Sequence, residues 1–213
     1  MRVYKFYGSG RALENLRQAR LKISTLDDMN DPFELLSYRL PMPEPRNSWL
    51  AARKTFGSQY GVICFCKSWG NPVMWSHYAE YHSGLALGFD IDDRFLNRVK
   101  YIKNRRNLPI SSDLSANTRV ISNALKTKFK HWEYEQEYRR ITELGEPDEV
   151  NGLYFLPFKG HMILREVIIG PKSKVTSDQI MDAYSSEPIS VITSRIGFRD
   201  FKVVQQKKQS LWK

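Results

Sequence analysis

The sequence predicts an α+β fold, a single domain with mixed or antiparallel sheets and flanking helices. Expected strands dominate the last third of the chain, most expected helices precede them, and the regular strand–helix–strand alternation of a doubly wound sheet is absent. The 213 residues are enough for one core, and 41% hydrophobic with 26% charged residues is ordinary for a globular protein. We therefore expect one domain over residues 1–205 and a basic tail over 206–213.

The strands are expected where β-branched, aromatic and other apolar residues form short runs. These runs lie at residues 2–6, 21–24, 60–66, 84–90, 99–103, 138–142, 153–158, 164–169, 189–193 and 198–205. The run at 60–66 has the composition of a buried strand, because it combines aromatic, β-branched and Cys residues.

The helices are expected where apolar residues recur at helical spacing or where Pro begins a compact run without Gly. These segments lie at residues 9–19, 49–59, 72–81, 112–130 and 177–184. Ser9 is the expected N-cap of the first helix, and Thr176 with Gln179 forms a capping-box pattern before the last. The Pro-rich stretch 41–48 is expected to be a loop.

Basic residues are concentrated in two segments of this chain, whose formal charge is +10. Residues 94–130 hold ten Lys or Arg and one acid, and residues 195–213 hold six and one acid. Such segments attract polyanions, above all RNA or DNA, or an acidic protein. The alternative is a solvated helix face followed by an irregular tail.

Compartment and membrane contact follow from what the sequence lacks. No stretch approaches the roughly 20 apolar residues of a membrane helix, and the first ten residues have no apolar core of a signal peptide. Cys64 and Cys66 are too close in sequence for an ordinary disulfide, and no second Cys pair completes a zinc site. We expect a cytoplasmic protein with no membrane partner and no bound metal.

The segment Asn30-Asp-Pro-Phe-Glu34 predicts a turn, because Asn and Asp hydrogen-bond their own backbone and Pro32 favours an extended residue before it. Two interpretations remain open. The turn is purely structural, with Phe33 in the core, or it presents Asn30 and Asp31 to a ligand.

The segment from Met74 to His82 combines imidazole and phenol side chains on one expected helix. His77 with Tyr81, and Tyr78 with His82, are four residues apart and so lie on one flank. The histidine spacing does not fit a zinc protease. Either Trp75 and Tyr78 are core residues, or His77 and Tyr78 line a cleft as ligand donors.

Three glutamates, Glu133, Glu135 and Glu137, occupy alternate positions before an expected strand. On a strand all three face one way, and crowded carboxylates raise the pKa of at least one, as in acid/base sites. The alternative is a surface ladder neutralised by Arg139 and Arg140. The sequence holds no P-loop, GxGxxG, GxSxG or HExxH motif, and Gly8-Ser-Gly10 is a weak phosphate-binding signal.

Six blocks, in order, resemble an uncharacterised bacterial family found among phage-defence and toxin-like genes. They are VYKFY, ISTLDDMNDPFE, ICFCKSW, MWSHYAEYHSGLALGFD, WEYEQEYR and LREVIIGP, and they span residues 3–171. The family carries NDPFE, MWxHYAxxH and YExEYR motifs. This chain departs from it at Cys64 and Cys66, where the family usually has Ser.

The order of these motifs is similar to that of the ADP-ribosyltransferase fold, and the resemblance implies NAD as a substrate. In those enzymes a late Glu stabilises the oxocarbenium-like ribose after nicotinamide leaves. By that analogy Glu137 is the catalytic acid and Glu135 completes a Glu-x-Glu pair. The residues expected to bind NAD are Tyr4, Lys5, Ser24, Asn30, Asp31, Phe33, Trp75, His77, Tyr78 and His82.

Three function classes therefore remain. The first is an ADP-ribosyltransferase-like effector or toxin, acting on RNA, DNA or protein in phage defence or beside an antitoxin that docks on residues 195–213. The second is a non-catalytic module that binds nucleic acid or a partner through the basic segment. The third is a nuclease with a divalent metal held by His131, Glu133, Glu135 and Glu137.

Overall fold

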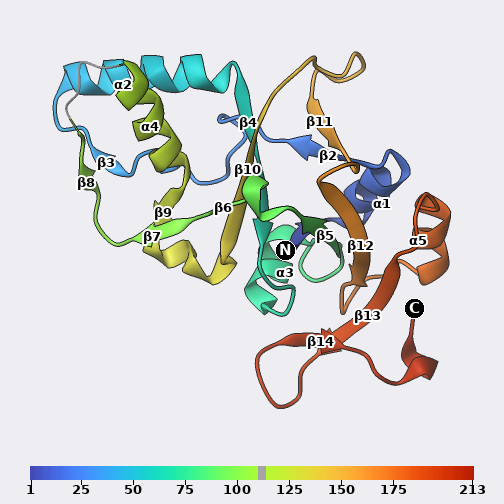
Figure 1. Ribbon diagram of the computed structural model, residues 1–213. Helices are drawn as coiled ribbons and strands as arrows, with labels where there is room; N and C mark the ends of the chain where they lie inside the picture. Colours follow the sequence, from blue (N-terminus) through green and yellow to red (C-terminus); the bar gives the residue numbers. More distant parts are fainter. Residues whose placement is uncertain (110–113) are drawn as a thin grey trace. The chain divides into compact units, whose positions relative to one another are not determined.

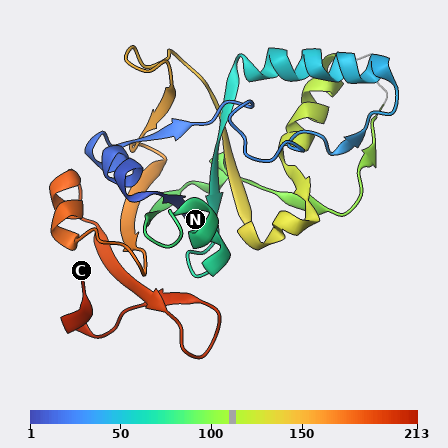
Figure 2. The same ribbon diagram turned by 180° about the vertical axis from the view of Figure 1, so that it is seen from behind.

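The α+β prediction is confirmed by the structure, a computed structural model that describes residues 1–109 and 114–213, with only the backbone for 114–118 (Figures 1 and 2). The chain forms two compact units, each made of segments that are distant in sequence. Unit 1 holds Met1–Leu21, Phe65–Phe95 and Leu156–Lys213, and unit 2 holds Lys22–Cys64 and Leu96–Phe155. The expectation of one domain over residues 1–205 stays a prediction.

Unit 1 is built on a mixed sheet. Its strands, in spatial order, are β14 (Val203–Gln205), β13 (Ser190–Ile196), β12 (Met162–Ile169), β5 (Leu85–Ile91) and β1 (Arg2–Tyr7). β12 and β13 are parallel and the other pairs are antiparallel. β5 is central and almost completely buried, as its continuous apolar sequence requires.

Three α-helices belong to unit 1: α1 (Ser9–Arg17), α3 (Pro72–Tyr78) and α5 (Ser177–Ala183). Two 3₁₀ turns, η1 (Asp93–Phe95) and η3 (Gln209–Leu211), complete it. The capping box of Thr176 and Gln179 before α5 is confirmed. The prediction that Ser9 is the N-cap of α1 is wrong, because Gly8 holds that position and the Ser9 hydroxyl instead donates to the Ser83 carbonyl, at 2.7 Å.

The segment expected to be a basic tail is held to unit 1 at Lys213. The Lys213 ammonium donates to the carbonyl oxygens of Gly170, Pro171 and Ser173, at 3.3, 3.1 and 2.7 Å. Its backbone N–H donates to Thr193 Oγ1 at 3.0 Å. The side chain of this lysine is therefore occupied inside the protein.

Unit 2 combines two helices with short strands. Its helices are α2 (Pro43–Gly57) and α4 (Leu114–Leu125), with the 3₁₀ turn η2 (Lys130–Glu135). Its strands are β3 (Tyr38–Arg39), β6 (Asn97–Arg98), β7 (Lys100–Ile102), β8 (Arg106–Asn107), β9 (Thr127–Phe129) and β10 (Glu137–Glu143). β3 pairs with β8 and β7 with β9, both in parallel, and β10 pairs with β6 in antiparallel orientation.

The core of unit 2 lies where α2 and α4 run side by side (Figures 1 and 2). Its buried residues are Leu26, Leu35, Tyr38, Trp49, Val62, Val120, Ile121, Ala124 and Leu125. In three further strands the chain passes from one unit to the other. These strands are β2 (Arg20–Ile23), β4 (Tyr60–Cys66) and β11 (Tyr154–Pro157).

Several expected elements differ from the structure, among them the helix expected at 72–81, which ends at Tyr78. The loop expected at 41–48 is wrong, because α2 begins at Pro43, where the first turn of a helix needs no proline N–H. The helix expected to reach Lys130 ends at Leu125 and is followed by β9 and η2, while residues 112 and 113 lie outside the described residues. The strand expected at 198–205 is limited to β14.

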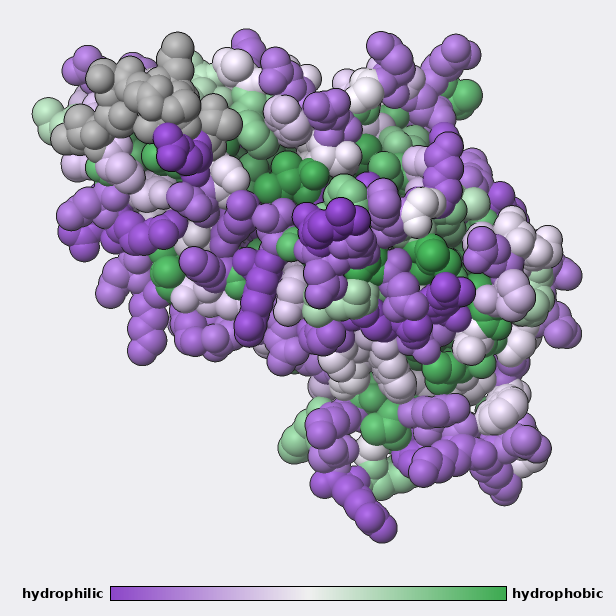
Figure 3. Space-filling model, in the orientation of Figure 1, coloured by the Kyte–Doolittle hydropathy of each residue, from purple (hydrophilic) through white to green (hydrophobic). Residues whose placement is uncertain are grey.

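Hydrophilic side chains cover most of the face shown in Figure 3, with small apolar areas between them. In the described part of the chain, no helix has the length and apolar character needed to cross a lipid bilayer.

Candidate functional site

A cluster of five charged side chains is buried inside unit 2. It consists of Glu34, Lys128, Glu135, Glu137 and Arg139, which we call the ion cluster. The Arg139 guanidinium is at its centre and donates to both oxygens of Glu34, at 3.0 and 2.7 Å. It also donates to both oxygens of Glu137, at 2.7 and 3.0 Å. This paired geometry is the arrangement in which arginine binds carboxylates most strongly.

Lys128 provides the second cation of the ion cluster. Its ammonium nitrogen lies 2.7 Å from Glu135 Oε2, 3.4 Å from Glu137 Oε2 and 3.5 Å from Glu34 Oε1. It also lies 4.7 Å from the centre of the Trp132 ring. One lysine thus contacts all three carboxylates of the ion cluster.

These contacts fix the ionisation of the ion cluster. Burial by itself would raise the pKa of Glu137, but the charge and hydrogen bonds of Arg139, with Lys128 and the Cys64 thiol, hold it at about 2. Burial would lower the pKa values of Lys128 and Arg139, and the neighbouring carboxylates raise both instead. Glu137 is therefore a carboxylate with no proton to donate at neutral pH.

The local backbone explains why two of the three glutamates turn inward. Glu133 and Glu135 lie in η2, and Glu137 begins β10 after Gln136, whose φ of 46° reverses the chain. The expectation that all three face one way is wrong, because Glu133 is exposed and pairs with Lys130. The surface-ladder alternative is also wrong for Arg139, which is completely buried.

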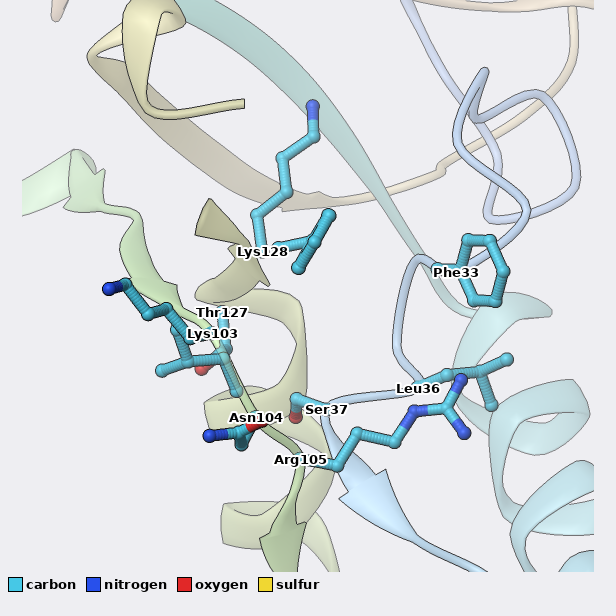
Figure 4. A pocket seen from close by; sticks show the side chains of 10 residues that line it. Phe33, Leu36, Ser37, Lys103, Asn104, Arg105, Thr127 and Lys128 are labelled. Atoms are coloured by element: carbon cyan, nitrogen blue, oxygen red, sulfur yellow. The ribbon is translucent and has the colours of Figure 1, made fainter. Parts of the chain in front are cut away.

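A pocket of about 250 Å³ opens beside the ion cluster, and we call it the first pocket (Figure 4). Its lining residues come from three segments of the chain. They are Phe33, Leu36 and Ser37 from the first, residues 102–105 from the second and residues 127–129 from the third. Lys128 connects the two sites, because its side chain lines the first pocket while its ammonium group binds Glu135.

The first pocket presents aromatic rings and cations, and no Asp or Glu occurs among the described residues that line it. Phe33 and Phe129 are 61% and 44% exposed, so the alternative that placed Phe33 in the core is wrong. Lys103 and Arg105 lie on opposite sides of the pocket, and the Arg105 guanidinium is 5.7 Å from the centre of the Phe33 ring (Figure 4). The arrangement is suited to an anion with a flat, apolar part.

The first pocket also contains a hydroxyl group without a partner. Ser37 is 7% exposed, and its Oγ has no hydrogen-bond partner among the described residues. A buried polar group without a partner is uncommon in folded proteins and costs about 1–3 kcal/mol. The Ser37 Oγ is shielded from solvent, so its missing partner is a cost within the fold and not a contact open to a ligand.

The other predicted site residues of unit 2 lie outside the lining of the first pocket. Asp31 is buried, and its Oδ1 accepts a hydrogen bond from the Phe33 N–H at 2.9 Å, which forms the expected turn. Ser24 forms a backbone bridge with Val62. The residue of this segment that reaches the ion cluster is Glu34, which the sequence did not single out.

The remaining predicted residues belong to unit 1. The Tyr4 hydroxyl donates to Glu166 Oε1 at 2.7 Å, and the Lys5 ammonium is 5.4 Å from the centre of the Tyr7 ring. Trp75 is completely buried, and its indole N–H donates to the Trp69 carbonyl at 2.6 Å. Tyr4 and Trp75 thus have partners that are part of the fold.

His77 and Tyr78 line an open cavity of about 640 Å³ in unit 1, together with Arg11, Glu80 and Tyr81. The chain after α3 has positive φ at Glu80, Tyr81 and His82, namely 46°, 52° and 76°. This turn brings the Glu80 carboxylate to the start of α1, where it accepts the Ser9 N–H at 3.0 Å. The phosphate position suggested by Gly8-Ser-Gly10 is therefore filled by Glu80.

The described residues contain no group of three or more His, Cys, Asp or Glu side chains arranged to hold a metal ion. Of the nuclease residues, Glu135 and Glu137 already bind Lys128 and Arg139, and Glu133 binds Lys130. His131 stacks on Phe129 with ring centres 4.5 Å apart. These contacts leave the carboxylates without an open set of ligand positions.

Comparison with known proteins gives one match. Residues 74–140 match the model of a family described as "Protein of unknown function (DUF2971)". This segment is less than half of the chain, and it agrees with the expectation of an uncharacterised family. It contains His77, Lys128 and Glu137, but not the turn at residues 30–34. No curated protein and no solved structure matches the chain.

Proposed function

We propose that the protein binds nucleotides in the first pocket. The observation that carries this proposal is the combination of two exposed phenylalanine rings with Lys103 and Arg105 in a lining whose described residues include no acid. Aromatic rings stack on bases, and basic side chains bind phosphate, so this combination is typical of nucleotide sites.

The volume and charge indicate the size of the ligand. About 250 Å³ is below the roughly 300–1,000 Å³ of pockets that enclose drug-sized ligands, so a single nucleoside unit fits better than a complete dinucleotide. Residues 102–105 and 127–129 of the lining belong to the segment 94–130, which has ten basic residues and one acid, and this excess favours polyanions.

Isothermal titration calorimetry tests the proposal with nucleoside monophosphates, NAD and short single-stranded oligonucleotides. Lys103→Gln removes a cation from the pocket and is expected to weaken binding of each bound ligand by roughly 5–10-fold, the effect of losing one phosphate contact. Lys54→Gln is the matched control, because Lys54 is an exposed lysine of the same unit that lines a different cavity. Equal affinities of the two variants would refute the proposal.

The transferase activity implied by the family resemblance is a second candidate, and one observation favours it. Lys128 joins the first pocket to Glu135 and Glu137, so the Glu-x-Glu pair lies one side chain from the proposed nucleotide. In this reaction the bond from nicotinamide to ribose breaks, nicotinamide leaves with the bonding electrons, and the acceptor bonds to the ribose and loses a proton. A carboxylate near the ribose would stabilise the positive charge.

The present contacts of Glu137 set the condition for that chemistry. Its carboxylate would have to exchange a partner for the substrate, because Arg139 and Lys128 bind both of its oxygens. Incubation with labelled NAD and cellular RNA, DNA or protein measures the activity. Transfer by the wild type and by Glu133→Gln, with none by folded Glu137→Gln, supports the transferase, and no nicotinamide release by the wild type contradicts it.

A further inference from the structure

A second pocket, of about 320 Å³, adjoins the first pocket in unit 2. The two share Leu36 and Arg105 in their linings, so Arg105 lies at the junction between them. The rest of the second pocket comes from the segment after β3 and the face of α2, with Tyr38, Arg46 and Trp49 among its lining residues. Two hollows of similar size thus lie in series, with a cation at their junction.

The second pocket also contains a buried polar group without a partner. Trp49 is 6% exposed, and its indole N–H has no hydrogen-bond acceptor among the described residues. The Trp49 ring packs edge-on against Tyr38, with ring centres 5.8 Å apart, so the indole is fixed in place. The Ser37 Oγ and the Trp49 indole nitrogen are both shielded from solvent, so the second pocket offers a ligand its apolar walls and its cations rather than these two groups.

Cationic side chains line both pockets. Lys103 lines the first pocket, Arg46 lines the second, and Arg105 lines both. The Arg46 guanidinium is held by the carbonyl oxygens of Leu40 and Pro41, at 2.7 and 3.1 Å, which fixes its charge at the second pocket. In the part of the chain that the structure describes, neither lining contains an Asp or a Glu.

From this arrangement we infer that the two pockets hold consecutive nucleotides of a single-stranded nucleic acid, with the linking phosphate at Arg105. The inference rests on the proposed function and adds a second subsite to it. A strand carries phosphates on both sides of each nucleoside, which matches cations at the junction and in each pocket. NAD has its phosphates only between its two nucleosides, and so leaves Lys103 or Arg46 without a phosphate.

Fluorescence anisotropy with labelled single strands of one, two and four nucleotides tests the second subsite. The second nucleotide is expected to increase affinity by about 10-fold, the effect of stacking one further base. Leu50 lines the second pocket, is absent from the lining of the first, and is largely exposed, so it can be changed with little effect on folding. Leu50→Glu places a negative charge there, and Leu50→Gln is the uncharged control.

The inference predicts that Leu50→Glu weakens binding of the dinucleotide and longer strands by about 5–10-fold relative to Leu50→Gln, and leaves the mononucleotide unchanged. It is overturned if the dinucleotide binds no more tightly than the mononucleotide, if NAD binds more tightly than the dinucleotide, or if the two Leu50 variants bind strands equally. Failure of the mononucleotide to bind would instead refute the proposed function itself, and the second subsite with it.

Discussion

The ion cluster and the first pocket are neighbours in unit 2, but their charged side chains differ in burial and in pairing. In the ion cluster three carboxylates and two cations are buried, and each cation is hydrogen-bonded to carboxylate oxygens. In the first pocket Lys103 and Arg105 are exposed, and the described lining residues include no acid. Lys128 belongs to both sites, with its stem at the pocket and its ammonium group in the ion cluster.

The difference indicates which charges maintain the fold and which are available to a ligand. A charge taken out of water must be paired, because its desolvation costs several kcal/mol. Glu137 and Arg139 are thus committed to each other, whereas the cations at the pocket stay hydrated until an anion arrives. The residues that look most catalytic in the sequence are therefore the most firmly paired in the structure.

The largest expected effect tests whether the ion cluster maintains the fold. Glu137→Gln leaves the buried Arg139 charge with one carboxylate fewer, and should lower the free energy of unfolding by about 3–5 kcal/mol. Glu133→Gln removes an exposed partner of Lys130 and should change it by less than about 1 kcal/mol. Urea denaturation at neutral pH measures both, and similar losses would show that the ion cluster has no special role.

A smaller effect on the free energy of unfolding, one that changes gradually with pH, is expected in acid. The pKa of Glu137 is about 2 in the folded protein against an ordinary 4.5, so the folded state holds the charged form more strongly than the unfolded state does. The stability that it contributes is complete above pH 4.5 and is lost as the pH falls toward about 2. The difference between wild type and Glu137→Gln should therefore narrow over this range, and a constant difference would contradict the paired carboxylate.

Removal of an aromatic ring from the first pocket is expected to affect ligand binding rather than folding. Phe33→Ala should weaken single-strand binding by about 1–3 kcal/mol if the ring stacks on a base. Unfolding should change by less than about 1 kcal/mol, because the ring is mostly exposed. Phe198→Ala, which truncates an exposed phenylalanine of unit 1, is the matched control and should leave binding unchanged.

The smallest expected effect is on the salt dependence of binding, and it tests whether Arg105 contacts a phosphate. Arg105→Gln should reduce the salt dependence of strand binding by about one unit of the log–log slope, with unfolding changed by less than about 0.5 kcal/mol. Binding titrations over a range of salt concentrations measure the slope, with Arg199→Gln in unit 1 as the control. An unchanged slope would mean that Arg105 contacts no phosphate.

Local patterns in the sequence were sufficient for much of the fold. The strand 60–66 and the capping box at Thr176 were correctly predicted, because local composition and capping depend on residues that are near in the chain. The start of α2 was missed because Pro43 and Pro45 suit a loop and a first helical turn equally well. The basic excess over residues 94–130 indicated the region of the first pocket, but not which of its cations line it.

The sequence by itself determined the fold class, the sign of the charge and the YExEYR motif that drew attention to Glu135 and Glu137. Only the tertiary structure decided that Glu34 reaches Arg139, 105 positions away, and that Glu133 faces solvent while Glu135 and Glu137 turn inward. The physical reason is that burial and pairing of charge are properties of residues distant in the chain. Spacing along the sequence gives the side chains available, and packing decides which of them water can reach.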